Sequence, residues 1–322
     1  MLSVKNIRIV FMGTPQFAVA TLGSLLMNGM NVVGVVTTPD KPAGRGRKLQ
    51  QSAVKEFAES NYIPTLQPDN LKDAEFLNAL KSFRADIFIV VAFRVLPEEV
   101  WKMPELGTIN LHASLLPDYR GAAPINHTII NGETRTGVTT FFIDDKIDTG
   151  NIIMREELHI FPFENAGDLH KRMTKIGARL VIKTLRSIAD NNVEPQMQSS
   201  LIDGQELKTA PKIFSKDCII DWNWDVTRIH NFVRGLAPSP GARTSLKNND
   251  TALSFKILES LPEHEKHDLA IGSIVSDGKH YIKVACPYGF IKVMCLQLEG
   301  RKKVYVTEFL KGFRIVDYTL IS

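Results

Sequence analysis

The segment IRIVFMGTPQFAVATLGSLLMNGMNVVGVVT, residues 7–37, contains the pattern that decides the fold of the chain. Ile7–Met12 and Val32–Thr37 are short apolar runs rich in β-branched residues, which is typical of parallel strands buried on both faces. Gln16–Met27, between them, has the apolar spacing of a helix. A strand, a helix and a second strand at this spacing predict a right-handed βαβ unit.

The same alternation continues through the first half of the chain. Two helical patterns, Ala53–Glu59 with Ser52 as its N-cap and Leu71–Phe83, come before further apolar runs at Ile87–Ala92 and Thr108–Leu111. Two more strands are predicted at Gly137–Ile143 and Ile152–Ile160, and a long helix at Asp168–Ile188. The first half is therefore predicted to be an α/β domain with a doubly wound, Rossmann-like and mostly parallel sheet.

The second half has a different character. Asn191–Gln205 is polar, contains Pro195 and shows no period, which indicates a linker. Beyond Ile219, short alternating segments are separated by Asp-Gly and Pro-Tyr-Gly turns. This pattern predicts a small antiparallel barrel or sandwich. We expect a first domain over residues 1–190, a linker over 191–211 and a second domain over 212–322.

Composition is ordinary for a soluble two-domain protein. The chain has 322 residues, of which 44% are hydrophobic and 23% charged. No apolar run approaches the ~20 residues that span a bilayer, and Met1–Gly13 lacks the cleavage site of a signal peptide. Cys218, Cys286 and Cys295 have no metal-ligand spacing and are odd in number, so we expect them in a core. A reducing cytoplasm fits these features.

Charge is distributed unevenly along the chain. Residues 1–207 contain 22 Lys and Arg against 23 Asp and Glu, whereas residues 208–322 contain 17 against 12. A positive excess is most often a solvated face. It gains meaning if the first domain holds an active site, since basic residues then help to hold a polyanionic substrate.

Three segments follow predicted strands, where open α/β sheets bind their ligands. The first, Gly13–Phe17, has a single glycine with a proline two residues later. This is not the GxGxxG fingerprint of a dinucleotide site, so a dinucleotide-linked oxidoreductase is not favoured. The alternative is a tight turn with Pro15 at the first helical position.

The second segment, Asn110–Gly121, places an amide and an imidazole on one strand face. Asn110 and His112 are two residues apart, so their side chains point the same way. Together they could supply an oxyanion donor and a general base. The alternative is that His112 is a structural residue, as a single histidine on a strand most often is, with its hydrogen bonds satisfied within the fold. Other histidines, such as His127 and His170, lie in helical patterns and are interpreted as structural.

The third segment, Ile143–Gly150, is an acidic turn after a strand. Most such turns are simply solvated, and this one lacks both the oxygen spacing of a calcium loop and an accompanying His or Cys set. A carboxylate from this turn next to His112 would orient the ring and stabilise its protonated form.

Taken together, these segments resemble the 10-formyltetrahydrofolate-dependent formyltransferase family. Asn110–Gly121 resembles the family's N-x-H-x-SLLPxxRG signature, and Asp148–Gly150 its D-x-G turn. The resemblance implies a catalytic trio of Asn110, His112 and Asp148, with no metal. It also implies a set of residues that bind the folate co-substrate, 10-formyltetrahydrofolate: Ser114, Leu115, Leu116, Pro117, Phe93, Arg94, Leu96 and Asp145. Ala92–Pro97 is one residue shorter than the family's common form.

Two features resemble the members that act on methionyl-tRNA. One is the first turn, Gly13–Phe17, and the other is a basic loop, Pro39–Leu49, absent from relatives with smaller substrates. The loop implies four tRNA-binding residues: Lys41, Arg45, Arg47 and Lys48. Those members also have an OB-like barrel that binds tRNA, and Ile220–Trp222 resembles its start. The resemblance thus implies a formyl transfer to initiator methionyl-tRNA, by a protein expected to be a cytoplasmic monomer.

Two alternatives remain at this point. One is a formyltransferase for a small amine, such as an amino nucleotide sugar or glycinamide ribonucleotide, with the barrel as a spacer. The other is a non-catalytic tRNA-binding protein, against which the joint presence of Asn110, His112 and Asp148 argues. A long, mobile and exposed loop at Lys41–Lys48 would favour the tRNA substrate.

Overall fold

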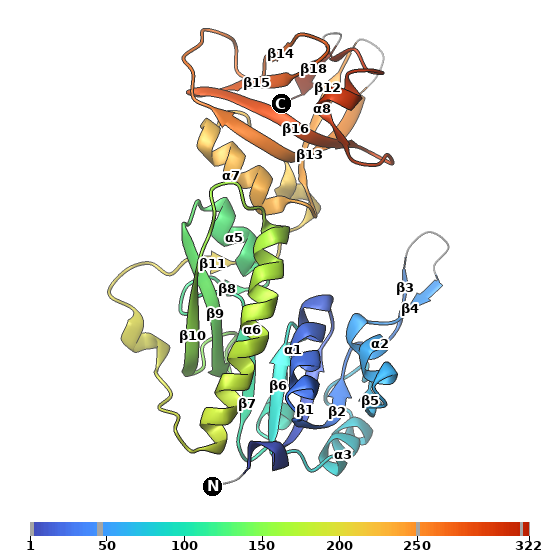
Figure 1. Ribbon diagram of the computed structural model, residues 1–322, viewed down its shortest axis with the longest axis vertical. Coiled ribbons are helices and arrows are strands. Elements are labelled where there is room, and N and C mark those ends of the chain that lie inside the picture. Colours follow the sequence, from blue (N-terminus) through green and yellow to red (C-terminus); the bar gives the residue numbers. More distant parts are fainter. Residues whose placement is uncertain (1–2, 44–47, 249–251, 316–317, 322) are drawn as a thin grey trace. The chain divides into compact units, whose positions relative to one another are not determined.

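A computed structural model describes residues 3–43, 48–248, 252–315 and 318–321. The chain forms two compact units that do not follow chain order (Figure 1). The first unit consists of Met1–Gly121, Thr136–Leu158 and His170–Thr209. The second consists of Ala122–Arg135, His159–Leu169 and Ala210–Ser322. Segments from within the first half of the chain therefore belong to the same unit as the C-terminal part.

The first unit is built around a seven-stranded sheet. Its strands, in spatial order, are β10 (Ile152–His159), β9 (Arg135–Phe142), β7 (Thr108–His112), β6 (Ile87–Val91), β1 (Arg8–Gly13), β2 (Asn31–Val36) and β5 (Thr65–Leu66). From β7 to β5 the neighbours are parallel, and β9 joins β7 antiparallel. The predicted doubly wound, mostly parallel sheet is confirmed.

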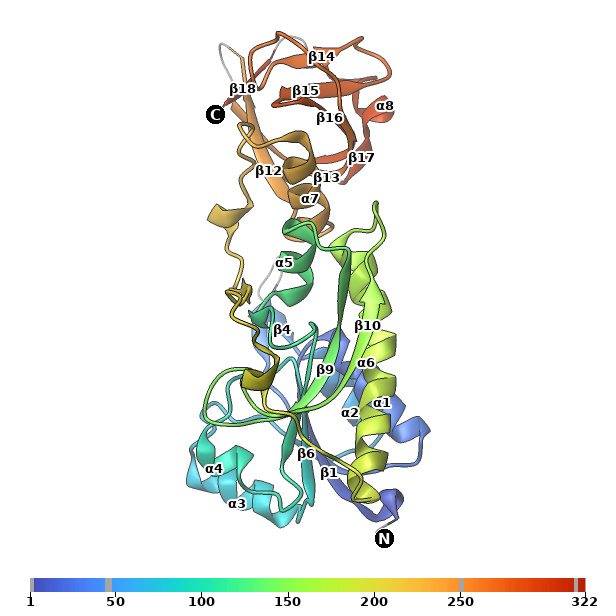
Figure 2. The ribbon, with the colours of Figure 1, turned by 90° about the vertical axis from the view of Figure 1, so that its left-hand side faces the viewer.

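Helices cover both faces of this sheet. They are α1 (Gln16–Met27), α2 (Ala53–Ser60), α3 (Ala74–Ser82), α4 (Glu98–Trp101) and α6 (Ala166–Ala189), after a short 3₁₀ turn η1 (Val4–Asn6). Figure 2 shows α3 and α4 on one side of the sheet and α1, α2 and α6 on the other. The Ser52 hydroxyl accepts a hydrogen bond from the Lys55 amide at 3.0 Å, so the predicted N-cap of α2 is confirmed.

Helix α3 begins three residues later than the sequence pattern predicts. The predicted start is Leu71, but the Asn70 side chain accepts a hydrogen bond from the Lys72 amide at 3.0 Å. Such a local side-chain bond forms a turn that competes with the helix. Asp73 then takes the N-cap position with an extended backbone.

A two-stranded hairpin leaves the sheet after β2. The sequence predicts a loop over residues 41–48, whereas the structure has antiparallel strands β3 (Lys41–Ala43) and β4 (Lys48–Gln50). Asp40 anchors the base, because its carboxylate accepts hydrogen bonds from Lys55 at 2.7 Å and Gln67 at 2.8 Å. The bond from Lys55, followed by that from Gln67, lowers the pKa of Asp40.

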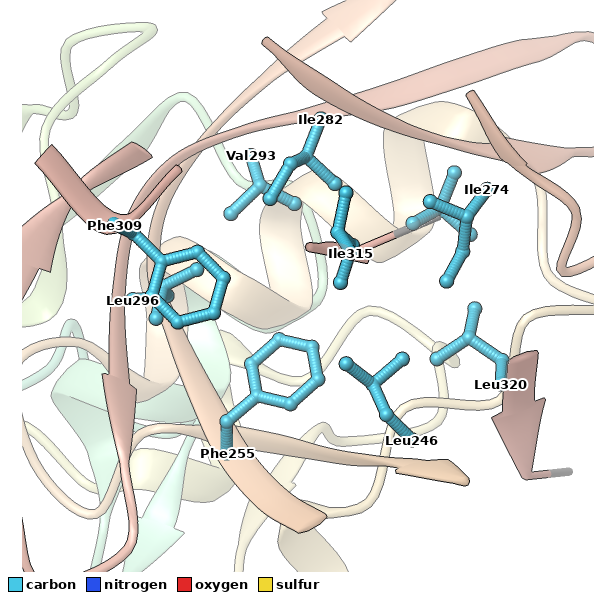
Figure 3. Close-up of a pocket in the computed structure, with 10 residues that line it drawn as sticks. Leu246, Phe255, Ile274, Ile282, Val293, Leu296, Phe309, Ile315 and Leu320 are labelled. Atoms are coloured by element: carbon cyan, nitrogen blue, oxygen red, sulfur yellow. The ribbon is translucent and has the colours of Figure 1, made fainter. Parts of the chain in front are cut away.

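The second unit contains a nearly closed antiparallel barrel. Its strands are β12 (Ala242–Lys247), β13 (Ala252–Glu263), β14 (Ile274–Ser276), β15 (Ile282–Cys286), β16 (Gly289–Leu298), β17 (Val304–Tyr305) and β18 (Thr319–Ile321). Figure 3 shows apolar side chains from these strands and from α8 (Val306–Phe309), among them Phe255 and Phe309, pointing toward one another inside the barrel. The interior is thus a packed core, and the predicted OB-like barrel is confirmed.

A helix that the alternating pattern did not predict packs against this barrel. Helix α7 (Val226–Leu236) begins after Asp225, whose carboxylate accepts a hydrogen bond from the Arg228 amide at 2.9 Å. Its apolar face, including Ile229 and Val233, joins the barrel core. Helix α5 (Pro124–Ile130) belongs to the same unit, and its Asn126 amide donates to the Gly235 carbonyl at 2.8 Å.

The remaining short elements are β8 (Arg120–Gly121), η2 (Gln198–Leu201), β11 (Thr209–Ala210) and η3 (Ser215–Cys218). All three cysteines are buried and free, which confirms their predicted place in a core. Among the described residues, no helix is both long and apolar enough to cross a membrane.

Candidate active site

The strand β7 directs Asn110 and His112 toward the α3 and α4 face of the sheet. In the register with β6, Asn110 lies beside Val90, which packs in the apolar core that includes α3 and α4. Leu111 points the opposite way, since a Cβ placed at Gly177 of α6 would come 2.8 Å from its Cδ2 atom. The predicted alternation along this strand is therefore present.

His112 has a different partner at each ring nitrogen. The side chain is only 7% exposed, and Nε2 lies 2.9 Å from the carbonyl oxygen of Tyr119. A carbonyl oxygen only accepts, so Nε2 donates the proton. Nδ1 lies 3.8 Å from Oδ2 of Asp148, beyond hydrogen-bond distance, so the carboxylate acts on the ring through its charge. In the neutral ring, Nδ1 is then the nitrogen free to accept a proton.

Asp148 is held by backbone geometry. Its φ is +56°, in the left-handed region, and its Oδ2 accepts a hydrogen bond from the Gly121 amide at 2.9 Å. Two residues later, a Cβ on Gly150 would lie 1.6 Å from the carbonyl oxygen of Phe142. The turn therefore requires a glycine at position 150 if Asp148 is to keep its place.

The side-chain amide of Asn110 has no hydrogen-bond partner among the described residues. The residue is half-buried. An unpaired, half-buried amide beside a buried imidazole is able to donate to an oxygen atom of a bound molecule. The structure therefore brings Asn110, His112 and Asp148 into one region, as their predicted roles require.

The predicted folate segment after β7 is held by hydrogen bonds. The Ser114 hydroxyl donates to the Asp118 carbonyl at 2.6 Å, and the Thr139 hydroxyl donates to the Ser114 carbonyl at 2.7 Å. Leu116 and Pro117 are buried, with Leu116 packed in a core cluster, while Leu115 is half-buried. These residues follow His112 closely in the chain, and their backbone is fixed by these contacts.

The other predicted folate residues lie at two more places on the unit. Arg94 donates to the Pro68 carbonyl at 2.7 Å and to the Asp69 carbonyl at 2.9 Å, and its guanidinium lies 5.3 Å from the Phe93 ring centroid. Leu96 packs in the core on the α3 and α4 face. Asp145 is exposed in the turn before Asp148.

Of the four predicted tRNA-binding residues, the structure describes Lys41 and Lys48. Lys41 is exposed in β3, and Lys48 begins β4. Arg45 and Arg47 lie outside the described residues. In the part of the chain that the structure describes, no group of three His, Cys, Asp or Glu side chains is placed to hold a metal ion.

Sequence reasoning missed two backbone groups that complete the site, the Tyr119 carbonyl and the Gly121 amide. Both lie inside the Asn110–Gly121 motif, but main-chain roles leave no residue-type signal. Tyr119 has a φ of +60°, which turns its carbonyl toward His112 and is uncommon for a residue with a large side chain.

Comparisons with known proteins cover both units. Residues 5–185 match the family described as formyl transferase, and residues 212–314 match the formyl transferase C-terminal domain. Proteins named methionyl-tRNA formyltransferase from Bacteroides thetaiotaomicron and Flavobacterium johnsoniae are 50% and 52% identical over 314 residues. The alignments cover 97% and 98% of this chain, and 98% of each relative.

The fold is also similar to solved structures. One is an N-formyltransferase from Helicobacter canadensis in complex with folinic acid and dTDP-3-aminofucose, with a TM-score of 0.63 and 21% sequence identity. The match covers 92% of this chain and 100% of that one. At this identity the similarity concerns the fold alone.

Proposed function

The chain belongs to the family of methionyl-tRNA formyltransferases, and we propose that it transfers the formyl group of 10-formyltetrahydrofolate to the free α-amino group of initiator methionyl-tRNA. The products are formylmethionyl-tRNA and tetrahydrofolate. We further propose that the protein works as a monomer in the cytoplasm. The observation that carries the proposal is the Asn110 amide, which has no hydrogen-bond partner in the described part of the chain, on the same strand face as a His112 ring whose Nδ1 faces Asp148.

The reaction begins with a neutral amine. A free α-amino group titrates at about 7.7–8.0, so a usable fraction is uncharged near neutral pH. Its nitrogen attacks the formyl carbon, and the carbonyl oxygen becomes an oxyanion. Asn110 donates a hydrogen bond to that oxygen, a contribution worth roughly 10²–10³ in rate for comparable donors.

His112 moves the proton between the two nitrogens. Nδ1 accepts the proton that the attacking amine loses, because Nε2 is already committed to the Tyr119 carbonyl. Asp148 stabilises the resulting imidazolium through its charge at 3.8 Å. The intermediate collapses when the bond from the formyl carbon to the folate nitrogen breaks, and Nδ1 returns its proton to that nitrogen. Assistance of this kind is worth about 10²–10⁴ in rate.

We assign the folate and tRNA roles to the residues that the family motif matches. The hydrogen-bonded Ser114–Pro117 segment and the Phe93–Leu96 segment, with Asp145, support a folate site in the same unit as the trio. Lys41 and Lys48 begin strands β3 and β4, and Arg45 and Arg47 lie between these strands in the sequence. This cluster of cations supports a contact with tRNA phosphates. The positive excess of residues 208–322 supports a tRNA-binding role for the barrel.

The test is direct formylation. Purified protein is incubated with 10-formyltetrahydrofolate and, in parallel, with initiator methionyl-tRNA, elongator methionyl-tRNA, glycinamide ribonucleotide or an amino nucleotide sugar. We expect formylmethionine on the initiator tRNA at a much higher kcat/KM than any other product. Preferential formylation of a small amine would overturn the proposed substrate.

A further inference from the structure

The segment that joins the two family-matched regions is part of the candidate active site. Residues 191–209 belong to the first unit, and the backbone groups of Gln196 and Ile152 exchange two hydrogen bonds of 2.8 Å. Twelve residues further on, the Lys208 carbonyl accepts a hydrogen bond from the Tyr119 amide at 2.6 Å. The sequence predicts a plain linker here, yet it contacts the turns on either side of His112.

Gln198 makes the most extensive of these contacts. It is 3% exposed, and its Nε2 donates to the Asp148 carbonyl at 2.9 Å and to the Gly150 carbonyl at 2.8 Å. Its Oε1 accepts from Nε and Nη2 of Arg120 at 3.1 and 2.7 Å. A side-chain amide has two N–H donors and two oxygen lone pairs, so every position is used.

These four bonds connect the two backbone segments that fix the Asp148 carboxylate. Asp148 has a φ of +56°, which is uncommon for residues with a Cβ, and the hydrogen bonds around the turn fix it in this conformation. The Nε2 atom of Gln198 donates hydrogen bonds to the carbonyls of residues 148 and 150 in that turn. It also holds Arg120, the residue before the Gly121 amide that binds Oδ2 of Asp148.

We infer that Gln198 is a positioning residue for the reaction: it sets Asp148 at its distance from Nδ1 of His112. The inference rests on the proposed function only for its effect on turnover. Lys208 makes a parallel contact on the other side, because its carbonyl binds the amide of Tyr119, whose own carbonyl holds Nε2 of His112. Both partners of the imidazole are therefore tied to the segment 196–208.

Two variants separate the role of the Nε2 donor of Gln198 from that of its Oε1 acceptor. Gln198→Met keeps the side-chain length and removes all four hydrogen bonds. Gln198→Glu keeps the acceptor for Arg120 but places an oxygen against the carbonyls of Asp148 and Gly150. We expect both to lower kcat by about 10- to 100-fold, since small misplacements of catalytic groups cost up to ~10². KM for folate and for tRNA should stay within about threefold. Gln196→Met is the matched control, because that side chain is exposed two residues earlier.

A double-mutant cycle with Asp148→Asn distinguishes positioning from general destabilisation. If Gln198 acts through Asp148, Gln198→Met should lower the residual turnover of the Asp148→Asn protein by less than about twofold. A loss as large as in the wild-type background would overturn the inference. So would a folded Gln198→Met protein with wild-type kcat.

Amide hydrogen exchange gives a readout that needs no substrate. Gln198→Met and Gln198→Glu should speed exchange in peptides covering residues 118–122 and 144–151. The protection of α1 should stay unchanged, and Gln196→Met should have no effect on exchange. If the wild type fails to formylate methionyl-tRNA but these peptides respond, the proposed function fails and the positioning stands. Unchanged exchange in both variants contradicts the inference. If Gln198→Met does not fold, the same measurements are made on Gln198→Glu alone, because this variant retains the hydrogen bonds to Arg120.

Discussion

Asp148 faces His112 from a left-handed backbone conformation, with its Oδ2 atom 3.8 Å from Nδ1 of the ring. The opposite ring nitrogen, Nε2, is occupied by the Tyr119 carbonyl at 2.9 Å. The ring therefore cannot turn without losing a buried hydrogen bond. In the proposed mechanism, proton exchange therefore takes place at Nδ1, the ring nitrogen that faces the carboxylate.

Replacing His112 tests this arrangement first. We expect His112→Ala to lower kcat by on the order of 10² or more, because acid–base assistance is lost. Folding, followed by thermal unfolding, should survive. His280→Ala is the matched control, since that histidine is 76% exposed in the second unit. A His112→Ala protein with near wild-type turnover would remove the ring from the mechanism.

Gly150 tests whether the Asp148 turn is sterically determined. A Cβ at this position would overlap the Phe142 carbonyl oxygen at 1.6 Å, so Gly150→Ala must open the turn and displace Asp148. We expect a stability loss of about 1–3 kcal/mol, as in overpacked cores, and a kcat at least ~10² lower. Gly312→Ala should change neither, because a Cβ there has no neighbour within 4 Å. Normal turnover in Gly150→Ala would show that the turn tolerates the shift.

The regular elements of the first unit were predictable because their apolar patterns are local. Gln16–Met27 is helical over the predicted residues, and the six predicted strands begin and end within two residues of their predicted bounds. The short strand β5 (Thr65–Leu66) was not predicted. Helix α7 was missed because its apolar positions occur among the short runs of a barrel sequence. The hairpin β3–β4 was missed since Pro42 indicates a strand end, although an edge position tolerates proline.

The site was only partly predictable, for a physical reason. Asn110 and His112 share a face through strand periodicity, which the sequence shows directly. The contact of His112 with Asp148 depends on a turn 36 residues away, so only the family motif could pair them. Gln198 lies 50 residues beyond Asp148 in a segment without periodicity, and nothing in its neighbours distinguishes it from the exposed Gln196.

His230 makes the stability of the second unit sensitive to acid. Burial, followed by the nearby charge of Arg234, lowers the pKa of His230 from 6.5 to about 4, and its Nδ1 lies 3.0 Å from the Ser260 hydroxyl. The folded protein thus keeps the ring neutral while the unfolded chain takes up a proton below pH 6.5. Stability is full above the unfolded pKa and falls as pH decreases toward 4.

The expected size is about 2 kcal/mol between pH 7.5 and 5, from the pKa difference. Urea unfolding of the wild type and of His230→Gln across this range measures it. The variant should lose about that much less stability on acidification than the wild type. His264→Gln, an exposed histidine in the same unit, should follow the wild type. Identical pH profiles for the wild type and His230→Gln would contradict the shift.

Arg45 is the residue on which the choice of tRNA as substrate rests most heavily. It lies outside the described residues, between strands β3 and β4, whose base is fixed to the first unit by the contacts of Asp40 with Lys55 and Gln67. The segment 43–48 has three cations among two glycines and no apolar residue large enough to pack. Before β3, the chain leaves β2 at the carboxyl end of that strand, which is the edge of the sheet at which β7 ends in His112.

A guanidinium presents several donors in one plane to phosphates or base edges, which an ammonium group cannot reproduce. Arg45→Lys should therefore lower kcat/KM for methionyl-tRNA although it keeps the charge. Arg45→Ala should lower it more, by about tenfold or more, since a hydrogen bond to a charged group contributes ~1.5–3 kcal/mol. Folate binding, measured by fluorescence titration, should be unchanged in both. Arg179→Ala, which removes an exposed arginine from α6, controls for a general loss of positive charge. Equal kcat/KM for the wild type and both Arg45 variants would show that the segment has no role in binding tRNA. A small amine would then be the favoured substrate.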